Sequence, residues 1–192
     1  TGVQADRGSD IRFIGGIVID DISAQGNESE AFAILAYDGG KVVADGTQDT
    51  RIRGEIGSFI DDPTATWTPR VKSNFGTARS SLTGMTFTTF HDGQASGGNI
   101  DMDFRNGAVW NMVPVDENLI TMYSHNDNNT IFSEVTNLSM ENAGVYIGST
   151  RENWGSSTLF DKPFQLRVNN LSGSGDFYLR TDLEKDISDS VL

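Results

Sequence analysis

The chain has 192 residues, of which 14 are Lys or Arg and 27 are Asp or Glu, so its formal net charge is -13. This negative charge, without a cluster of Lys and Arg, argues against nucleic acid or an anionic membrane surface as the partner. The sequence has no Cys, which excludes a thiolate nucleophile, a Cys-ligated metal site, an iron–sulfur cluster and a disulfide framework. Because 36% of the residues are hydrophobic and 11 are Phe, the apolar surface suffices for a folded core.

Breaker residues interrupt the whole chain, with 21 Gly and many Asn, Ser, Thr and Asp, so long helices are not expected. The best helical candidate is residues 27–31, and even this stretch is compatible with a loop. Residues 11–19, 100–105, 165–168 and 176–180 alternate apolar and polar side chains, which indicates half-buried β-strands. In residues 100–105 the apolar side chains are predicted to face a core and the charged ones to face solvent.

Four stretches of the sequence read as a strand, a short corner and a second strand. Residues 11–20 and 33–45 carry a Gly-Gly pair at the corner, residues 100–112 carry Asn-Gly, and residues 138–147 form the fourth copy. Their spacing predicts a repeat of about 22 residues, a length typical of solenoids and arrays. Such a unit favours a parallel β-helix, in which the inward residues of successive coils stack into one core.

The corner dipeptides leave a second fold open, because Asn106-Gly107 and Asp38-Gly39 are also strong signals for β-hairpins. A β-sandwich or jelly roll therefore competes with the β-helix on pattern alone. Between residues 61 and 98 the repeat is hard to follow, and we expect loops that leave the coil there, with residues 85–88 as a returning strand. Loops on such scaffolds are common binding sites.

The C-terminal third carries an ordered set of motifs. An apolar strand at residues 164–168 is followed by Asn-Leu-Ser-Gly-Ser-Gly at 170–175, by an aromatic strand that leads into Thr-Asp-Leu at 181–183, and by an Asp-containing strand at 186–192. This order resembles the segment that closes the passenger stem of pertactin-like autotransporters. A Leu-Ser-Gly-Ser-Gly stretch alone would indicate only a turn, whereas the order of several elements is specific.

Upstream stretches extend the resemblance to roughly residues 82–192. Residues 106–112, followed by Asn118-Leu119, are similar to the rung that precedes the cap in those passengers, and residues 81–84 fit a rung opening. The sequence departs from the family by ending where the cap would continue towards a membrane β-barrel. It also begins without Met or a leader, so we expect an excised or processed piece of a longer protein.

The resemblance implies an all-β, right-handed parallel β-helix, a single-stranded solenoid of the pectin-lyase type, with a C-terminal β cap. It divides the chain into β-helix coils with inserted loops at 1–99 and the last coils with an autochaperone cap at 100–192. It implies a non-catalytic stem that drives folding and translocation across the outer membrane in type V secretion and displays an adhesin or other virulence factor.

The resemblance also implies where the protein acts and with what. We expect a secreted protein, or one held at the cell surface of a Gram-negative bacterium. The expected partners are its own outer-membrane β-barrel translocator, absent from this chain, and a host receptor or surface glycan. No nucleic acid, cofactor, metal or catalytic residue is expected.

The residues expected to form the folding cap are apolar or aromatic side chains of the last coils and the glycines between them. Among them, Leu171, Phe177 and Leu179 are expected to be buried, so that a charge at any of these positions would prevent folding. The eight cap residues are Trp110, Leu166, Val168, Leu171, Gly173, Gly175, Phe177 and Leu179.

An enzyme remains the alternative, in the form of a β-helical polysaccharide lyase or hydrolase. Asp101 and Asp103 are predicted to lie on one outward face, where carboxylates of adjacent coils could complete a catalytic or calcium site. The carboxylates considered for that role are Asp116, Glu117 and Asp127. A dispersed, solvated acidic face is the simpler interpretation of these residues.

The remaining chemistry-bearing residues give weaker signals. His91 and His125 are the two histidines, and neither lies in a metal or catalytic spacing motif. Trp110 is predicted to belong to the core. Trp67 and Trp154 lie in loop-like segments, where an exposed Trp could bind a sugar face or a protein; covering the end of the core is the other role considered for Trp154. A β-sandwich carbohydrate-binding or viral coat module is a third possibility.

Overall fold

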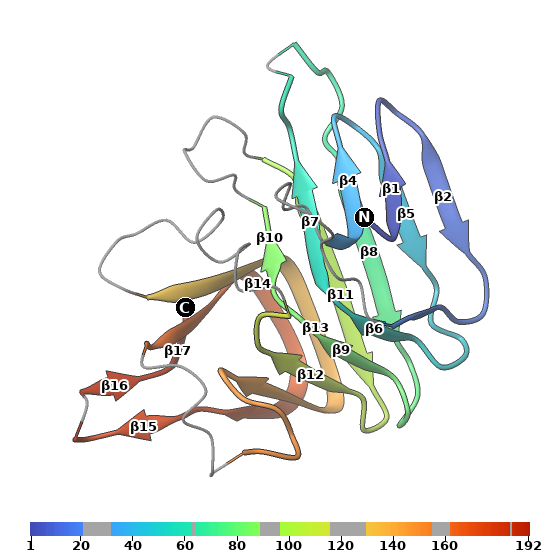
Figure 1. The fold of residues 1–192 in the computed structure, drawn as a ribbon. Coiled ribbons are helices and arrows are strands. Elements are labelled where there is room, and N and C mark those ends of the chain that lie inside the picture. The colour runs from blue at the N-terminus through green and yellow to red at the C-terminus, as the bar shows by residue number, and fades with distance from the viewer. Residues whose placement is uncertain (21–31, 63, 89–96, 116–129, 155–161, 185) are drawn as a thin grey trace.

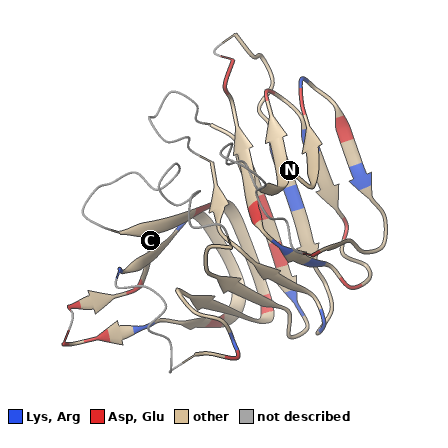
Figure 2. Ribbon diagram, in the orientation of Figure 1, with Lys and Arg blue, Asp and Glu red and all other residues tan. Residues whose placement is uncertain are grey.

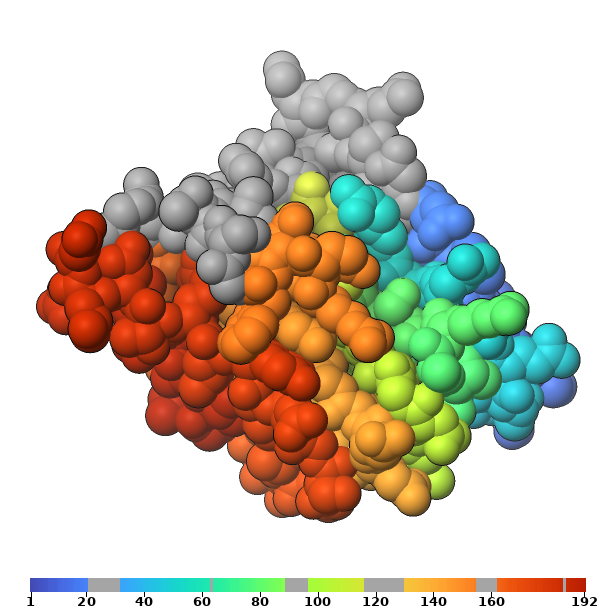
Figure 3. Space-filling view, turned by 90° about the horizontal axis from the view of Figure 1, so that it is seen from below, coloured from blue at the N-terminus to red at the C-terminus, as the bar shows by residue number. Residues whose placement is uncertain are grey.

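A computed structural model describes residues 1–20, 32–62, 64–88, 97–115, 130–154, 162–184 and 186–192. These residues form a parallel β-solenoid, so the predicted β-helix is confirmed. Each pass of the chain contributes strands to three sheets (Figure 1). Figure 3 shows the passes as successive bands that follow the sequence from one end of the molecule to the other. The proposed helical stretch at 27–31 lies outside the described residues, and the division into residues 1–99 and 100–192 stays a prediction.

The first sheet contains β1 (Val3–Ala5), β4 (Phe32–Tyr37), β7 (Glu55–Phe59) and β10 (Thr86–Phe87), paired in parallel in this order. The strand β4 is buried along almost its whole length. Its continuous apolar run is typical of a strand that is covered on both faces.

The second sheet contains β2 (Asp10–Phe13), β5 (Lys41–Ala44), β8 (Arg70–Phe75) and β11 (Asn99–Arg105), again parallel. Along β8 and β11 the inward side chains are apolar or small and the outward ones are charged or amide-bearing. This alternation confirms the orientation predicted for residues 100–105.

The third sheet contains β3 (Val18–Ile19), β6 (Arg51–Arg53), β9 (Ser81–Thr83) and β12 (Val109–Met112). Each of these strands places one or more apolar side chains in the core and its polar side chains outside. The strands are short, as expected where tight corners interrupt the chain.

Two long strands, β13 (Ile131–Ile147) and β14 (Phe164–Tyr178), pair with each other, and β13 continues both the second and the third sheet. Because β13 pairs with both β11 and β12, the second and third sheets join into one hydrogen-bonded sheet. The first sheet continues onto β13 through side chains, since Thr86 Oγ1 and Ser133 Oγ lie 2.7 Å apart.

The period of the solenoid differs from the prediction. Corner hydrogen bonds between successive passes join residues 30 apart, as from Gly15 to Asp45 and from Asn106 to Gly76. The predicted unit of about 22 residues holds for β4 and β7, where Ile34 lies opposite Ile56, and is wrong for the other passes up to β14, whose paired residues are 28 to 36 apart. The prediction aligned residues 33–45, which span the corner between the first and second sheets, with corners between the second and third. The register shows that Ile11 lies opposite Val42.

The core is a stack of large side chains along the solenoid axis. The rings of Phe75 and Phe104 are parallel with centroids 4.4 Å apart, and Trp110 stacks on Phe104 at 5.9 Å. Phe32 and Phe59 pack edge to face at 5.8 Å. Such pairs add to the stabilisation from burying apolar area.

The chain ends in a small cap beyond β14. The strands β15 (Thr181–Asp182) and β16 (Ile187–Ser188) form an antiparallel hairpin, and β17 (Ser190–Val191) then pairs with the beginning of β14. The structure therefore has a C-terminal β cap, as predicted.

Candidate functional site

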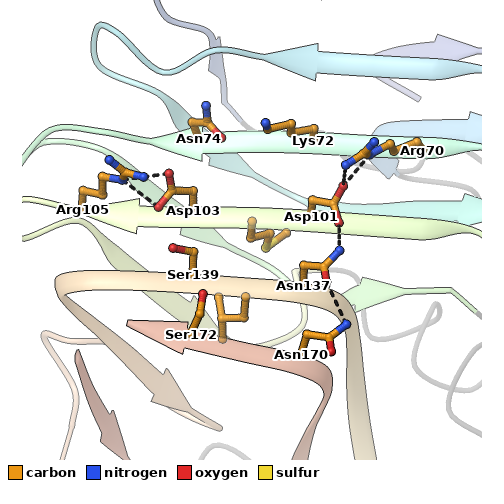
Figure 4. Close-up of a pocket in the computed structure, with 12 residues that line it drawn as sticks. Arg70, Lys72, Asn74, Asp101, Asp103, Arg105, Asn137, Ser139, Asn170 and Ser172 are labelled. Atoms are coloured by element: carbon orange, nitrogen blue, oxygen red, sulfur yellow. Dashed lines mark hydrogen bonds and ion pairs between the residues drawn. The ribbon is translucent and has the colours of Figure 1, made fainter. Parts of the chain in front are cut away.

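A shallow polar hollow of about 480 Å³ lies on the outer surface of the second sheet. Figure 4 shows four side chains from successive passes that form one network across it. Arg70 Nε and Nη2 bind Asp101 Oδ2, and Asn137 Nδ2 donates to Asp101 Oδ1. Asn170 Nδ2 continues the network by donating to Asn137 Oδ1 at 2.9 Å. The strand alternation places these polar groups outside because their neighbours face the core.

A second row of polar side chains lies beside this network. Arg105 Nε lies 2.9 Å and 2.8 Å from the two carboxylate oxygens of Asp103. Arg105 donates a hydrogen bond to the Asp103 carboxylate, and the bond together with the negative charge of Asp103 raises the pKa of the Arg105 guanidinium. Ser139 and Ser172 occupy the next two passes in the same row.

The predicted carboxylate pair does share one face, but both members are engaged. Asp101 is only 7% exposed, with Arg70 on one oxygen and Asn137 on the other. A general acid or base needs access to a substrate proton, which this packing of Asp101 blocks. The network instead links β8, β11, β13 and β14 across the outer surface.

Several predicted candidates lie outside the described residues: His91, His125, Asp116, Glu117 and Asp127. Among the residues that the structure does describe, no three His, Asp or Glu side chains are grouped to hold a metal ion. The same part of the chain contains no helix long and apolar enough to cross a membrane. In Figure 2, the acidic and basic positions are distributed over the strands and corners of the ribbon.

The cap is held by a buried ion pair that the sequence analysis missed. Asp189 has a fully buried side chain and accepts hydrogen bonds from Arg180 Nε at 2.8 Å and Arg180 Nη2 at 3.0 Å. It also accepts from the backbone amides of Phe164 at 2.8 Å and Arg180 at 3.0 Å. The guanidinium of Arg180 further donates to the Lys162 carbonyl and lies over the Phe164 ring. This pair therefore joins β17 and the hairpin to the start of β14.

A sequence signal for this pair exists. In the strand around Asp189, the residue two positions earlier is the buried Ile187, so Asp189 occupies an inward position by strand alternation. A charged residue at an inward position requires a partner of opposite charge.

The structure places the eight predicted cap residues unevenly. Trp110 and Leu166 are fully buried, which confirms Trp110 as a core residue, and Val168 and Phe177 are half-buried. Leu171 and Leu179 are 53% and 42% exposed, so the expectation that they are buried is wrong.

The reason for this exposure is the position of β14 in the solenoid. Residues 170–178 pair with β13 on one side, whereas β17 covers β14 on the other side only at Gln165 and Leu166. Side chains beyond Leu166 therefore have packing partners mainly from the preceding pass. The role of all eight residues in folding stays a prediction.

Steric crowding explains why both Gly positions of the Leu-Ser-Gly-Ser-Gly motif carry no side chain. Gly173 has a φ of +88°, and a Cβ at this position would collide with the Met140 carbonyl oxygen. A Cβ at Gly175 would lie 2.8 Å from the Ala143 carbonyl oxygen. The motif thus lets the last pass follow the corner of β13 closely.

The tryptophans in loop-like segments are exposed, as predicted, with Trp67 at 64% and Trp154 at 49%. Trp154 packs edge-on against Tyr178 at a centroid distance of 5.2 Å. Tyr178 in turn stacks on Tyr146 at 4.2 Å. Trp154 therefore lies on the outer surface of the third sheet, and the alternative that it covers the core is wrong.

Comparison of the chain with known protein families, curated proteins and solved structures finds no match. The β-solenoid fold is established by its own strand pairing, and the resemblance to autotransporter passengers rests on the sequence motifs alone.

Proposed function

We propose that the chain is a non-catalytic stem segment of a secreted autotransporter passenger, and that its last pass and cap form the autochaperone that starts folding. The observation that carries this proposal is the Arg180–Asp189 pair, which fastens the cap to the beginning of β14. In the proposed protein the stem is displayed at the surface of a Gram-negative bacterium after crossing the outer membrane through its own β-barrel.

The pairing pattern supports folding in steps from one end. Strands of the second and third sheets pair in parallel with the equivalent strand of the next pass throughout, and those of the first sheet do so up to β10, so a folded pass presents edges on which a neighbour can form. The last pass has cover from β17 and the hairpin, which come from the residues directly after it. It can therefore form with few contacts from distant sequence.

The alternative function, a β-helical polysaccharide lyase or hydrolase, needs a carboxylate that is free to exchange a proton. Asp101 is bound by Arg70 and Asn137, and Asp103 by Arg105. A reducing-end assay on acidic polysaccharides tests the non-catalytic assignment. Turnover by the wild-type chain that is lost in Asp101→Asn would overturn it.

Refolding of the full chain from urea tests the autochaperone role. Pulse-labelling hydrogen exchange, read by mass spectrometry, should show the amides of β13 and β14 protected before those of β4 to β8. The Asp189→Asn variant should fold more slowly, because a contact made in the folding nucleus affects the folding rate. Arg180→Lys is a milder variant of the same pair if Asp189→Asn does not fold.

Asp176→Asn is the matched control, since Asp176 is an exposed carboxylate on the same last pass. It should leave the folding rate unchanged. Earlier protection of β4 to β8 would overturn the proposal, as would an Asp189→Asn variant that unfolds faster but folds at the wild-type rate.

A further inference from the structure

A second hollow, of about 340 Å³, lies on the outer surface of the third sheet. Its lining includes Arg53, Arg79 and Arg151, which come from β6, from the corner before β9 and from the segment after β13. All three side chains are exposed. Three arginines thus line one hollow of a chain whose net charge is -13.

Among the described residues, carboxylates neutralise some of the arginines on the solenoid and leave those of this hollow unpaired. Arg70, Arg105 and Arg180 each bind an Asp carboxylate. Within the described part of the chain, Arg53, Arg79 and Arg151 have no carboxylate within ion-pair distance, although Glu152 also lines the hollow. The site therefore carries a local excess of positive charge that suits a negatively charged ligand.

A continuous column of outward side chains connects this hollow with aromatic rings. By strand register, Arg53 lies opposite Thr83, Thr83 opposite Asn111, and Asn111 opposite Tyr146, which lies opposite Tyr178. Neighbouring strands are about 4.8 Å apart, so the column extends over roughly 20 Å. This length suits an extended chain of several units better than a single small ion.

The middle of the column is held in a fixed geometry. Asn111 Oδ1 accepts a hydrogen bond from the Arg151 amide at 2.9 Å, and Asn111 Nδ2 donates to Thr83 Oγ1 at 3.1 Å. These bonds fix the backbone of Arg151 beside the third sheet. Ser81 and Thr83 add hydroxyl groups that can exchange hydrogen bonds with the hydroxyls of a ligand.

The other end of the column is an aromatic platform. Tyr146 and Tyr178 stack with nearly parallel planes, and the exposed Trp154 stands edge-on to Tyr178. Burial, and then the hydrogen bond with Tyr178, raise the pKa of Tyr146 above its ordinary value. Such rings present an apolar face and a polar edge to a ligand.

We propose that this column on the third sheet is a binding site for an acidic polysaccharide, whose carboxylate or sulfate groups pair with the three arginines. A sugar ring of the same chain packs on the aromatic platform, and hydroxyls of the ligand bond to Ser81 and Thr83. A nucleic acid fits less well, because hydroxyl groups of Ser81 and Thr83 lie beside the arginines and suit a ligand that carries many hydroxyls between its charges. The proposal is independent of the stem role and concerns what the stem's surface binds.

Isothermal titration of the full chain with a heparin octasaccharide and with an oligogalacturonate tests the proposal, with neutral dextran as the comparison ligand. At low salt, at least one acidic oligosaccharide should bind and dextran should not. The triple variant Arg53→Gln/Arg79→Gln/Arg151→Gln should bind more than about tenfold more weakly, because each charge-assisted hydrogen bond contributes substantially. Trp154→Ala should weaken binding by about threefold.

The matched control is Arg12→Gln/Lys41→Gln/Lys72→Gln, which removes the same charge from exposed positions on the second sheet. It should retain binding within about twofold, because Arg12, Lys41 and Lys72 lie on the second sheet and do not line the hollow. Thermal unfolding of both triple variants verifies that they are folded. The absence of binding to either acidic oligosaccharide overturns the proposal, as does an equal loss in the control variant. A single-stranded oligonucleotide is titrated as well. If it binds as tightly as the acidic oligosaccharides, and if the arginine triple variant loses this binding, the polysaccharide proposal is overturned in favour of a nucleic-acid ligand.

Discussion

The middle passes of the solenoid and its last pass are stabilised by different interactions. In the middle, the fully buried Phe75 and Phe104 stack between neighbouring passes, and Trp110 packs parallel to Phe104 within the same pass. In the last pass, residues 171–176 are exposed, and the polar pair of Arg180 and Asp189 attaches the cap.

The difference shows what a solenoid needs where its stacking ends. A middle pass is covered on both sides, so burial of apolar side chains is sufficient to hold it. The last pass is covered on one side along most of its length, and the chain compensates with hydrogen bonds and charge from its own next segment. The variants below test whether these two mechanisms are separate.

The largest loss of stability is expected for Trp110→Ala in the middle passes. The change removes a fully buried ring and the indole donor of the 3.0 Å hydrogen bond to the Gly84 carbonyl. We expect a loss of about 5 kcal/mol, the upper end of the range for Trp→Ala in cores. Urea unfolding measures it, with Trp154→Ala as the matched control on an exposed ring. Similar losses for the two variants would contradict the stacked-core account.

A smaller loss, of about 3 kcal/mol, is expected for Asp189→Asn in the cap, because it leaves the buried Arg180 without its counter-charge. Native-state hydrogen exchange should show the loss first in β14 and β17. The amides of β5 and β8 should keep their protection if the two mechanisms are separate. Equal loss of protection throughout the chain would show that the cap and the middle passes unfold as one unit.

A loss of only about 0.5 kcal/mol is expected for Leu171→Asp, because Leu171 is 53% exposed on the uncovered side of the last pass. Leu166→Asp is the matched comparison, since Leu166 is fully buried and a charge there has no partner. Urea midpoints of the two variants should therefore differ widely. A Leu171→Asp variant that does not fold would contradict this account and indicate that Leu171 is buried in the cap.

The smallest effect is expected at an N-terminal corner, where Asp45 accepts a 2.9 Å hydrogen bond from the Gly15 amide. This bond, followed by that from Thr47, lowers the pKa of Asp45 below its ordinary value of 3.8. A lowered pKa in the folded state stabilises the protein above the unfolded pKa, and this stabilisation disappears as the pH falls through the folded value. Asp45→Asn should therefore be less stable than wild type at pH 7.

The measurement for Asp45→Asn is the difference in urea midpoint from wild type at a series of pH values. This difference should shrink as the pH falls below 3.8. Asp10→Asn provides the control, because Asp10 is exposed on β2 and contributes no corner hydrogen bond within the described residues. A difference that is constant with pH would show that the Asp45 carboxylate does not support the corner.

The fold class was predictable because strand alternation and Gly-containing corners are local signals. Residues 100–105 show this, with apolar side chains inward and charged ones outward as expected. The period was not predictable from corners alone, since a Gly-Gly pair looks the same at any corner of a pass. Gly39 and Gly15 occupy different corners, and only the strand register reveals this.

The sites were less predictable than the fold because they depend on that register. Asp101 and Asp103 were correctly placed on one face, yet sequence could not show that Arg70 and Asn137 occupy the oxygens of Asp101. The convergence of Arg53, Arg79 and Arg151 requires the true period, since the three residues belong to different passes.

The spacing of about 30 residues between paired strands also determines the entropy of folding. Corner contacts join Gly15 to Asp45, Thr50 to Ser80 and Gly76 to Asn106, each over a separation of 30 residues. Register separations vary around this value, from 22 residues between Ile34 and Ile56 to 36 between Met102 and Leu138. Because the entropy of loop closure grows only with the logarithm of loop length, its cost changes little from pass to pass. The sequence separation of contacts does not grow with the number of passes, so the relative contact order falls as a solenoid lengthens. A longer solenoid of similar passes would add its last pass at nearly the same entropic cost as its first.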